Sequence, residues 1–176
     1  LDLGHVHFAM ISGPLERSDR ARDRVDGVRE ALSTRGLALR PTHLLEAAYT
    51  LPAGSDAMRR LLAVRPRPTA VICGNDLVAV AAIAACREHG LDVPRDVSIA
   101  GFGNMEIAAL QSPALTTIRS PIAAIGAAAG KQILARIAGE DAPPKVEFEA
   151  ELVVRASTAS APRHPRSAKG RRTGTG

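Results

Sequence analysis

The polar side chains that could bind a small ligand follow short apolar runs of the sequence. Tyr49 comes after the run THLLEA, and Asn104 comes after VSIAGF. Asn75 and Asp76 follow TAVICG, and Arg22 belongs to the helical pattern after VHFAMIS. A carboxylate that accepts hydrogen bonds, an arginine that donates them and an aromatic ring that stacks on C–H groups together suit a sugar or another polyol.

The same residues also have simpler interpretations. Asn75 and Asp76 stand where a helix begins, and such side chains often only cap free backbone N–H groups. Arg22 is one of several arginines on the polar face of a helix. On composition alone, both the ligand site and these structural roles remain open.

The glycine-rich stretch GFGNME is an incomplete match to a dinucleotide-binding fingerprint. Gly101 and Gly103 fit the pattern, but Glu106 occupies the third glycine position. Its carboxylate would repel a pyrophosphate at the start of a helix. We therefore do not expect a phosphate cradle here.

Catalytic and metal-binding patterns are equally weak. The sequence contains no G-x-S-x-G nucleophile motif. His5 and His7 could share one face of a strand, but no Cys or acidic residue lies at metal-ligand spacing. The sequence predicts no enzyme activity, no metal and no cofactor.

Apolar runs alternate with helical patterns along most of the chain. Strands are predicted over 6–12, 42–47, 69–74 and 97–102. Between them we expect a helix from Ser18 or Asp19 to Gly36, one capped by Ser55, and one from Asn75 or Asp76 to Gly90. This βαβα order predicts an α/β fold, a parallel sheet with helices on both faces.

In a parallel sheet of this kind, ligands bind in the loops beyond the carboxyl ends of the strands. The loops after Ser12, Ala47, Gly74 and Phe102 should therefore share one edge. That edge would bring together the polar residues named at the outset.

The pattern changes after residue 118. A helix is expected over IAAIGAAAGKQILARIAG, with Ser120 as its cap, Pro121 as its first residue and Gly139 at its end. The stretch VEFEAELVV, residues 146–154, alternates apolar residues with glutamates, as in a strand with one wet face.

Composition limits the setting of the protein. Cys73 and Cys86 lie in apolar patterns, which indicates buried thiols in a reducing compartment. The most apolar helical stretch, residues 77–86, is 10 residues long, against about 20 for a membrane span. Together with the lack of a signal-peptide pattern, this predicts a cytoplasmic protein without membrane contact.

The net charge of +5 has a local origin. Removing five basic residues near the C-terminus leaves 18 basic residues against 18 acidic ones; the five are Arg163, Arg166, Lys169, Arg171 and Arg172. Residues 159–176 are therefore expected to form a disordered basic tail rather than a nucleic-acid site.

The helix over 77–86 is apolar nearly all round, so its far side should meet another helix or a second subunit.

Several segments together resemble a known family. CGNDLVAVAAIAACREHGLDVPRDVSIAGFGN followed by SPALTTIRSP is similar to the effector-binding part of lactose- and galactose-repressor-type (LacI/GalR) transcriptional regulators. GHVHFAMISG and ARDRVDGVREAL match the same family in order and spacing, and coverage runs from about residue 3 to Thr158. The resemblance implies a fold like that of periplasmic sugar-binding proteins, with two α/β lobes and a ligand cleft between them.

The resemblance also implies how the chain is divided. Residues 1–118 would form most of the C-terminal lobe, and 119–158 would cross into the N-terminal lobe and return. The rest of that lobe and the helix-turn-helix would precede Leu1. Operator DNA would then be bound only through the missing N-terminal domain, and the protein would act as a homodimer.

Site residues carry over from the family position by position. Arg22 matches its effector-binding arginine, Asp76 its effector-binding acid, and Tyr49 a position that stacks an aromatic ring on the ligand. Gly103 stands where many relatives have an acid, and Asn104 partly substitutes for it. The implied function is the binding of an effector, a sugar or a related small polar molecule, that shifts the regulator between states. The alternative is a sugar-binding protein of a transport system.

Overall fold

The computed structural model describes residues 2–141 and 145–163. Its strands form one sheet in the order β2-β1-β3-β4-β5-β6. The strands are β1 (Phe8–Ser12), β2 (Leu44–Glu46), β3 (Ala70–Cys73), β4 (Ser98–Phe102), β5 (Thr116–Arg119) and β6 (Glu151–Val153). The helices are α1 (Asp19–Ser33), α2 (Leu51–Ala63), α3 (Asp76–Glu88), α4 (Glu106–Leu110) and α5 (Ile122–Ile137), with a 3-10 turn, η1 (Pro41–His43).

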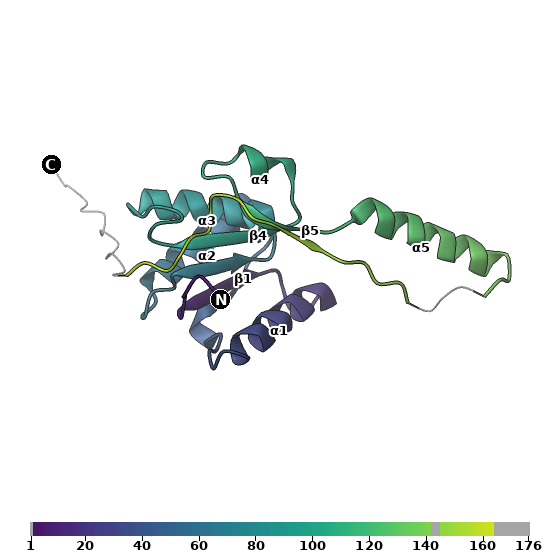
Figure 1. Cartoon of the computed structure of the whole chain (residues 1–176), viewed down its shortest axis with the longest axis horizontal. Coiled ribbons are helices and arrows are strands. Elements are labelled where there is room, and N and C mark those ends of the chain that lie inside the picture. Colours follow the sequence, from purple (N-terminus) through teal and green to yellow (C-terminus); the bar gives the residue numbers. More distant parts are fainter. Residues whose placement is uncertain (1, 142–144, 164–176) are drawn as a thin grey trace.

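The first five strands run parallel, and β6 is antiparallel to β5. Helices α2 and α3 pack against one face of the sheet, and α1 lies on the other face (Figure 1). Because side chains alternate along a strand, Ala9 and Ile11 enter the core beneath α2 and α3, whereas Phe8 and Met10 face α1. The predicted α/β fold, with helices on both faces, is confirmed.

Helix ends follow local side-chain chemistry. The Ser18 hydroxyl accepts a hydrogen bond from the Ala21 N–H, as predicted for the cap of α1. The prediction of Ser55 as the cap of the next helix was wrong. Helix α2 starts earlier, because Thr50 caps it by accepting from the Ala53 N–H, at 3.4 Å, and Pro52 fits the first turn.

The C-terminal part differs most from expectation. Residues 116–119, for which the sequence predicted no strand, form β5. The strand predicted over 146–154 is paired only at Glu151–Val153. Val146 and Phe148, expected on a covered face, are 43% and 37% exposed, because no described element packs on them.

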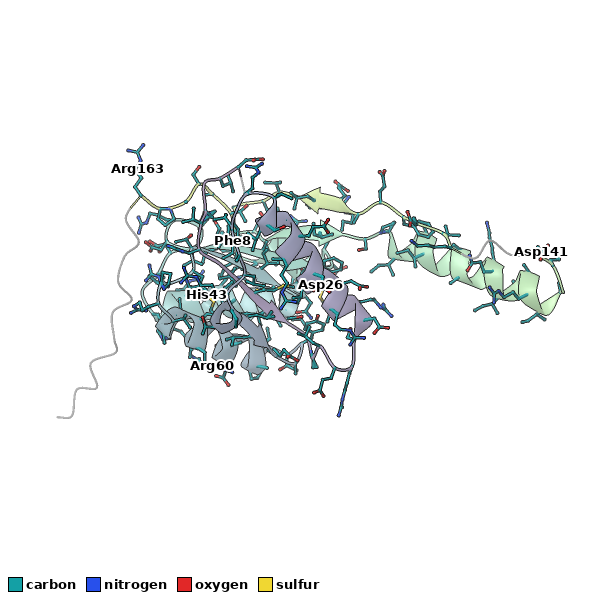
Figure 2. The ribbon with its side chains drawn as sticks, turned by 90° about the horizontal axis from the view of Figure 1, so that it is seen from below. Phe8, Asp26, His43, Arg60, Asp141 and Arg163 are labelled. Atoms are coloured by element: carbon teal, nitrogen blue, oxygen red, sulfur yellow. The ribbon has the colours of Figure 1, made fainter. Side chains whose placement is uncertain are left out.

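Helix α5 extends away from the rest of the molecule (Figures 1 and 2). We call residues 120–141 and 145–150 the arm, and the remaining described residues the body. Pro121, not Ser120, occupies the cap position of α5, and no side chain caps it. None of the residues of α5 is buried, and Ile137 is 78% exposed.

The start of the basic tail is ordered. The Ala159 N–H donates to the Ser98 hydroxyl at 3.0 Å, and the Ala161 N–H donates to the Leu3 carbonyl at 2.8 Å. Disorder was expected to begin at residue 159, but these contacts hold Ala159 and Ala161 against the body. The rest of the tail, residues 164–176, lies outside the described residues. No helix in the described part of the chain has the length and hydropathy needed to cross a membrane.

Candidate ligand site at the carboxyl ends of the strands

The parallel register of β1 to β4 brings their following loops to one edge of the sheet, as the sequence predicted. Tyr49 follows β2, Asn75 follows β3, and Asn104 follows β4. Each of these three side chains is partly exposed. They form the accessible part of the candidate site.

Tyr49 lies across the ends of β1 and β3. A Cβ atom added to Gly13 would lie 2.8 Å from Tyr49 Cζ, and one added to Gly74 would lie 2.7 Å from its hydroxyl oxygen. Only glycine at these two positions leaves room for the ring. The sequence therefore provides a flat aromatic surface on this edge of the sheet.

Arg24 is the main site residue that sequence reasoning missed. Its Nη2 donates to the Tyr49 hydroxyl at 3.1 Å, and its guanidinium carbon lies 4.6 Å from the centre of the Phe102 ring. This distance is within the range of a cation–π interaction. The buried Nε of Arg24 has no hydrogen-bond partner within the described part of the chain.

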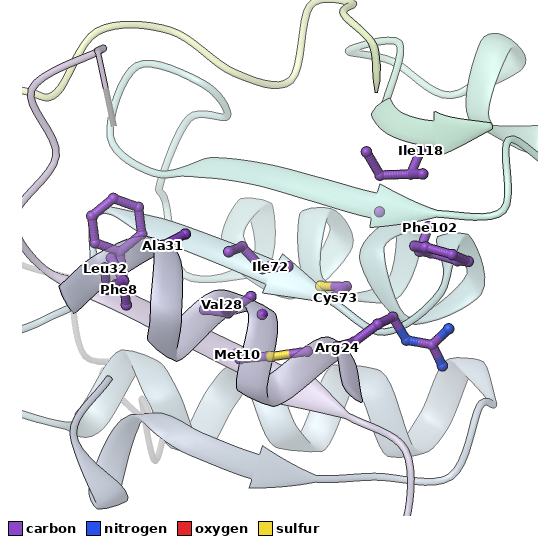
Figure 3. Close-up of a pocket in the computed structure, with 12 residues that line it drawn as sticks. Phe8, Met10, Arg24, Val28, Ala31, Leu32, Ile72, Cys73, Phe102 and Ile118 are labelled. Atoms are coloured by element: carbon purple, nitrogen blue, oxygen red, sulfur yellow. The ribbon is translucent and has the colours of Figure 1, made fainter. Parts of the chain in front are cut away.

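Arg24 also lines a cavity of about 360 Å³ between α1 and the sheet (Figure 3). Apart from the arginine, the side chains that line it are mainly apolar, among them Met10, Val28 and Ile72. A signal for Arg24 was present in the sequence. It precedes Val28 by four residues, so it shares the inward face of α1.

Arg22 lies elsewhere on α1. Its side chain is 46% exposed and forms an ion pair with Asp19. It also donates to the Leu15 carbonyl. The structure thus does not bring Arg22 together with the other candidate residues, and its assignment to the site stays a prediction.

Asn75 combines both interpretations that the sequence left open. Its Oδ1 accepts a hydrogen bond from the Val78 N–H at 2.9 Å and so caps α3. The side chain is nevertheless only partly buried. The capping bond uses the carbonyl oxygen and fixes the orientation of the amide group, whose nitrogen remains a potential donor.

Asp76 has no exposed surface. Its Oδ1 accepts from the Thr117 hydroxyl and its Oδ2 accepts from the Met105 N–H, both at 2.6 Å. Both carboxylate oxygens are therefore engaged by the protein itself. In this structure Asp76 lies beneath the accessible surface of the site.

Asn104 adopts a left-handed backbone conformation, with φ of 52°, which Asn tolerates better than most residues. Its Oδ1 accepts a hydrogen bond from Arg155 Nη2 at 2.7 Å. Arg155 belongs to the segment after β6, which sequence reasoning did not connect with the site. The pair places a second guanidinium beside the turn after β4.

His5 lies at the opposite end of the sheet, beside the start of β3. His5 Nε2 is 2.9 Å from the Ala159 carbonyl oxygen, and His5 Nδ1 is 2.9 Å from Thr69 Oγ1. Because a carbonyl only accepts, Nε2 carries the proton, and the threonine hydroxyl donates to Nδ1. Burial lowers the pKa of His5. Among the described residues, no three His, Cys, Asp or Glu side chains gather as metal ligands.

The site therefore offers donors and flat rings more than free carboxylates. Arg24, Arg155 and the Asn75 amide can donate, and the rings of Tyr49 and Phe102 can face C–H groups. Such a set suits a polar molecule with several oxygen acceptors and a compact ring.

The sequence of residues 1–158 matches the family described as the periplasmic binding protein-like domain. Among curated relatives, the chain is 36% identical over 160 residues to the HTH-type transcriptional repressor PurR of Aliivibrio fischeri. This match covers 89% of the chain and 47% of PurR. It is 39% identical over 167 residues to the HTH-type transcriptional regulator MalR of Streptomyces coelicolor, covering 92% of this chain and 48% of MalR.

Solved structures agree with these relatives. A LacI family transcriptional regulator from Bifidobacterium animalis superposes with a TM-score of 0.83 at 34% identity, covering 90% of this chain and 57% of that one. The complex of the regulator CelR with cellobiose gives a TM-score of 0.84 at 32% identity, covering 89% and 48%. The chain belongs to the LacI family and contains its periplasmic binding protein-like part. It spans about half the length of the curated relatives that it matches.

Proposed function

We propose that this chain is the effector-binding part of a LacI-type transcriptional regulator, and that its effector is a sugar or a related small polar molecule. The observation that carries the proposal is the hydrogen bond between Arg24 and Tyr49 at the carboxyl edge of the sheet, the edge from which Asn75 and Asn104 also follow their strands. Ligands bind at this edge in open α/β folds. The CelR–cellobiose complex supports a sugar as the ligand class.

Each residue has a distinct role in the proposed site. The Tyr49 ring stacks on the C–H face of the ligand, and Arg24, held by Tyr49 and Phe102, donates to its oxygens. Asn75 and Asn104 bind hydroxyl groups through their amides. Arg22 keeps only its sequence-based assignment to the site, and taking part would require its side chain to leave the ion pair with Asp19.

A second lobe would complete the site from the other side. The apolar side chains of the arm, such as Ile122 and Leu134 at 68% and 67% exposure, support packing of residues 119–158 against such a lobe. The matched relatives are about twice as long as this chain. A helix-turn-helix elsewhere in the whole protein would bind operator DNA, and the protein would work in the cytoplasm.

Dimerisation fits the surface shared by α2 and α3. A groove of about 420 Å³ there is lined by residues that include Leu51, Pro52, Val80 and Ala84. Leu51 is 47% exposed, which supports a second copy packing at this place. Equilibrium sedimentation of the whole protein should show a dimer, and Val80→Glu should shift it to monomer.

Thermal unfolding of the whole protein with a panel of neutral mono- and disaccharides, cellobiose included, tests the proposed function. A sugar present at 100 times its Kd should add about 2.7 kcal/mol of stability. Tyr49→Ala and Arg24→Ala should remove this gain, whereas Arg20→Ala, an exposed arginine of the same helix, should retain it.

The same panel separates the two arginine assignments. Loss of the gain in Arg24→Ala but not in Arg22→Ala would favour the structural assignment over the sequence prediction. If no sugar stabilises the protein, the sugar class is wrong. If a sugar binds equally to the Tyr49 and Arg24 variants, the location of the site is wrong.

A further inference from the structure

The buried carboxylate of Asp76 joins two parts of the chain that are far apart in sequence. One is the turn Gly103–Met105, through the Met105 N–H, and the other is β5, through the Thr117 hydroxyl. Thr117 is 1% exposed. Neither Asp76 nor Thr117 can contact a ligand from this position, yet both lie directly behind Asn104.

The fit around this carboxylate is tight. A Cβ atom added to Gly101 would lie 2.3 Å from Asp76 Oδ1 and 2.9 Å from Leu115 Cδ2. The strand β4 can therefore approach the carboxylate only because residue 101 lacks a side chain. This close packing restricts Asp76 to the position in which both of its oxygens are hydrogen-bonded.

The turn is attached to β5 at further points. The Gly103 N–H donates to the Ile118 carbonyl at 2.9 Å, and the Asn104 N–H donates to the Thr117 hydroxyl oxygen at 3.3 Å. Thr117 thus accepts from the turn and donates to Asp76. Because β5 leads directly into the arm, the turn is fixed to the outgoing connection.

Arg155 attaches the same turn to the returning connection. Its Nη2 donates to Asn104 Oδ1, and its Nη1 donates to the Leu115 carbonyl, both at 2.7 Å. Its backbone N–H donates to the Thr116 hydroxyl oxygen at 2.9 Å. The turn that carries Asn104 is therefore held by β5, which leads into the arm, and by the segment that follows β6 on the return from it.

We propose that Asp76 is a positioning residue of the effector site rather than an effector ligand. This inference rests on the proposed function for the role of Asn104. The carboxylate holds Asn104 in its left-handed conformation and locks the turn to β5, so a ligand that displaces the turn must also displace both connections to the arm. Charge-assisted hydrogen bonds of this length are strong enough for such a role.

Hydrogen exchange of the whole protein without ligand tests the proposal. In Asp76→Asn, the Met105 amide should exchange about 10- to 100-fold faster, as expected when a hydrogen bond to a charged acceptor is weakened. Thr117→Val, which removes the hydroxyl at nearly constant volume, should accelerate exchange at Asn104 and Met105 by a similar factor. Thr117→Ser keeps the hydroxyl and should restore slow exchange.

A matched control is available at the other end of the sheet. Thr69 is a buried threonine whose hydroxyl bonds to His5. Thr69→Val should lower global stability while leaving the ratio of exchange rates between Met105 and the core amides unchanged. The double variant of Asp76→Asn and Thr117→Val should exchange no faster at Met105 than Asp76→Asn alone, because both act in one network.

Unchanged exchange at Met105 in either single variant would overturn the proposal, as would Thr117→Ser behaving like Thr117→Val. Additive effects in the double variant would also overturn it. Since no ligand is used, this result stands apart from the sugar panel. Failure of every sugar to bind would contradict the proposed function without altering the exchange pattern.

Discussion

Helices α3 and α5 are both rich in alanine and apolar residues, yet their surroundings are opposite. Most residues of α3 are buried between the sheet and α2, and Val78, Ala79 and Ala82 have no exposed surface. No residue of α5 is buried. The difference lies in the neighbours, because only α3 has a sheet and a second helix against it. The comparison shows that an apolar helical sequence predicts that the helix packs against another element, but does not predict which element that is.

The largest expected difference between body and arm is in hydrogen exchange. Amides of α3 should exchange only on global unfolding, whose free energy is about 5–15 kcal/mol for a domain. Amides of α5 in this chain should exchange close to the rate of an isolated helix. Mass spectrometry of exchange over time measures both. In the whole protein α5 should become protected, and continued fast exchange there would contradict a second lobe.

Side-chain truncation gives the next largest contrast. Leu61 has no exposed surface, so Leu61→Ala should cost about 2–5 kcal/mol of unfolding free energy. Leu134 is 67% exposed on the arm, and Leu134→Ala in this chain should change stability by less than about 0.5 kcal/mol. Urea unfolding followed by circular dichroism measures both values. Equal losses would mean that the arm packs on the body in solution.

A pH effect within the body should be smaller. Burial lowers the pKa of His5 below its ordinary value of 6.5. The unfolded chain then binds a proton that the folded chain does not, so stability is full above about pH 6.5 and falls as the pH drops toward the folded pKa. The slope cannot exceed about 1.4 kcal/mol per pH unit for one proton.

Urea unfolding at pH 7.5 and pH 5.5 measures this effect. His5→Gln preserves a donor for Ala159 and an acceptor for Thr69 but cannot titrate, so its stability should depend less on pH than that of the wild-type chain. An identical pH dependence in both proteins would contradict the assignment to His5.

The smallest effect concerns thiol reactivity, which leaves stability unchanged. Burial raises the pKa of the Cys73 thiol far above its ordinary value and raises the pKa of Cys86 to about 12. Both thiols should be protonated at neutral pH and react slowly with a disulfide reagent until the body unfolds. Fast labelling of the folded chain would show that the body opens more readily than its packing indicates.

The sequence predicted the body better than the site. Strand and helix patterns located most of the core because apolar periodicity reflects burial directly. The cap of α2 was misplaced because Ser55 and Thr50 are both good caps, and only Pro52 favours the earlier start. The strand β5 was missed because it is short, and the apolar run in its four residues, TTIR, is a single isoleucine.

Site residues were harder to predict because their roles depend on contacts across the fold. A helical pattern shows that Arg22 and Arg24 face different directions, but not which of them meets Tyr49. The ND pair marks a helix start, and only the packing around Gly101 shows that Asp76 points inward while Asn75 stays accessible. Arg155 reaches Asn104 from 51 positions away, so no local pattern could have connected them.

The ring of Tyr49 lies where side chains on Gly13 and Gly74 would otherwise be. These three positions are therefore sterically coupled: a larger residue at either glycine requires a smaller one at position 49, or a displaced ring. LacI family members that differ in the ligand bound at this edge should show the three positions covarying. An engineer seeking a new ligand specificity at the proposed site should randomise them together, because single changes at the glycines would collide with the ring before any ligand arrives.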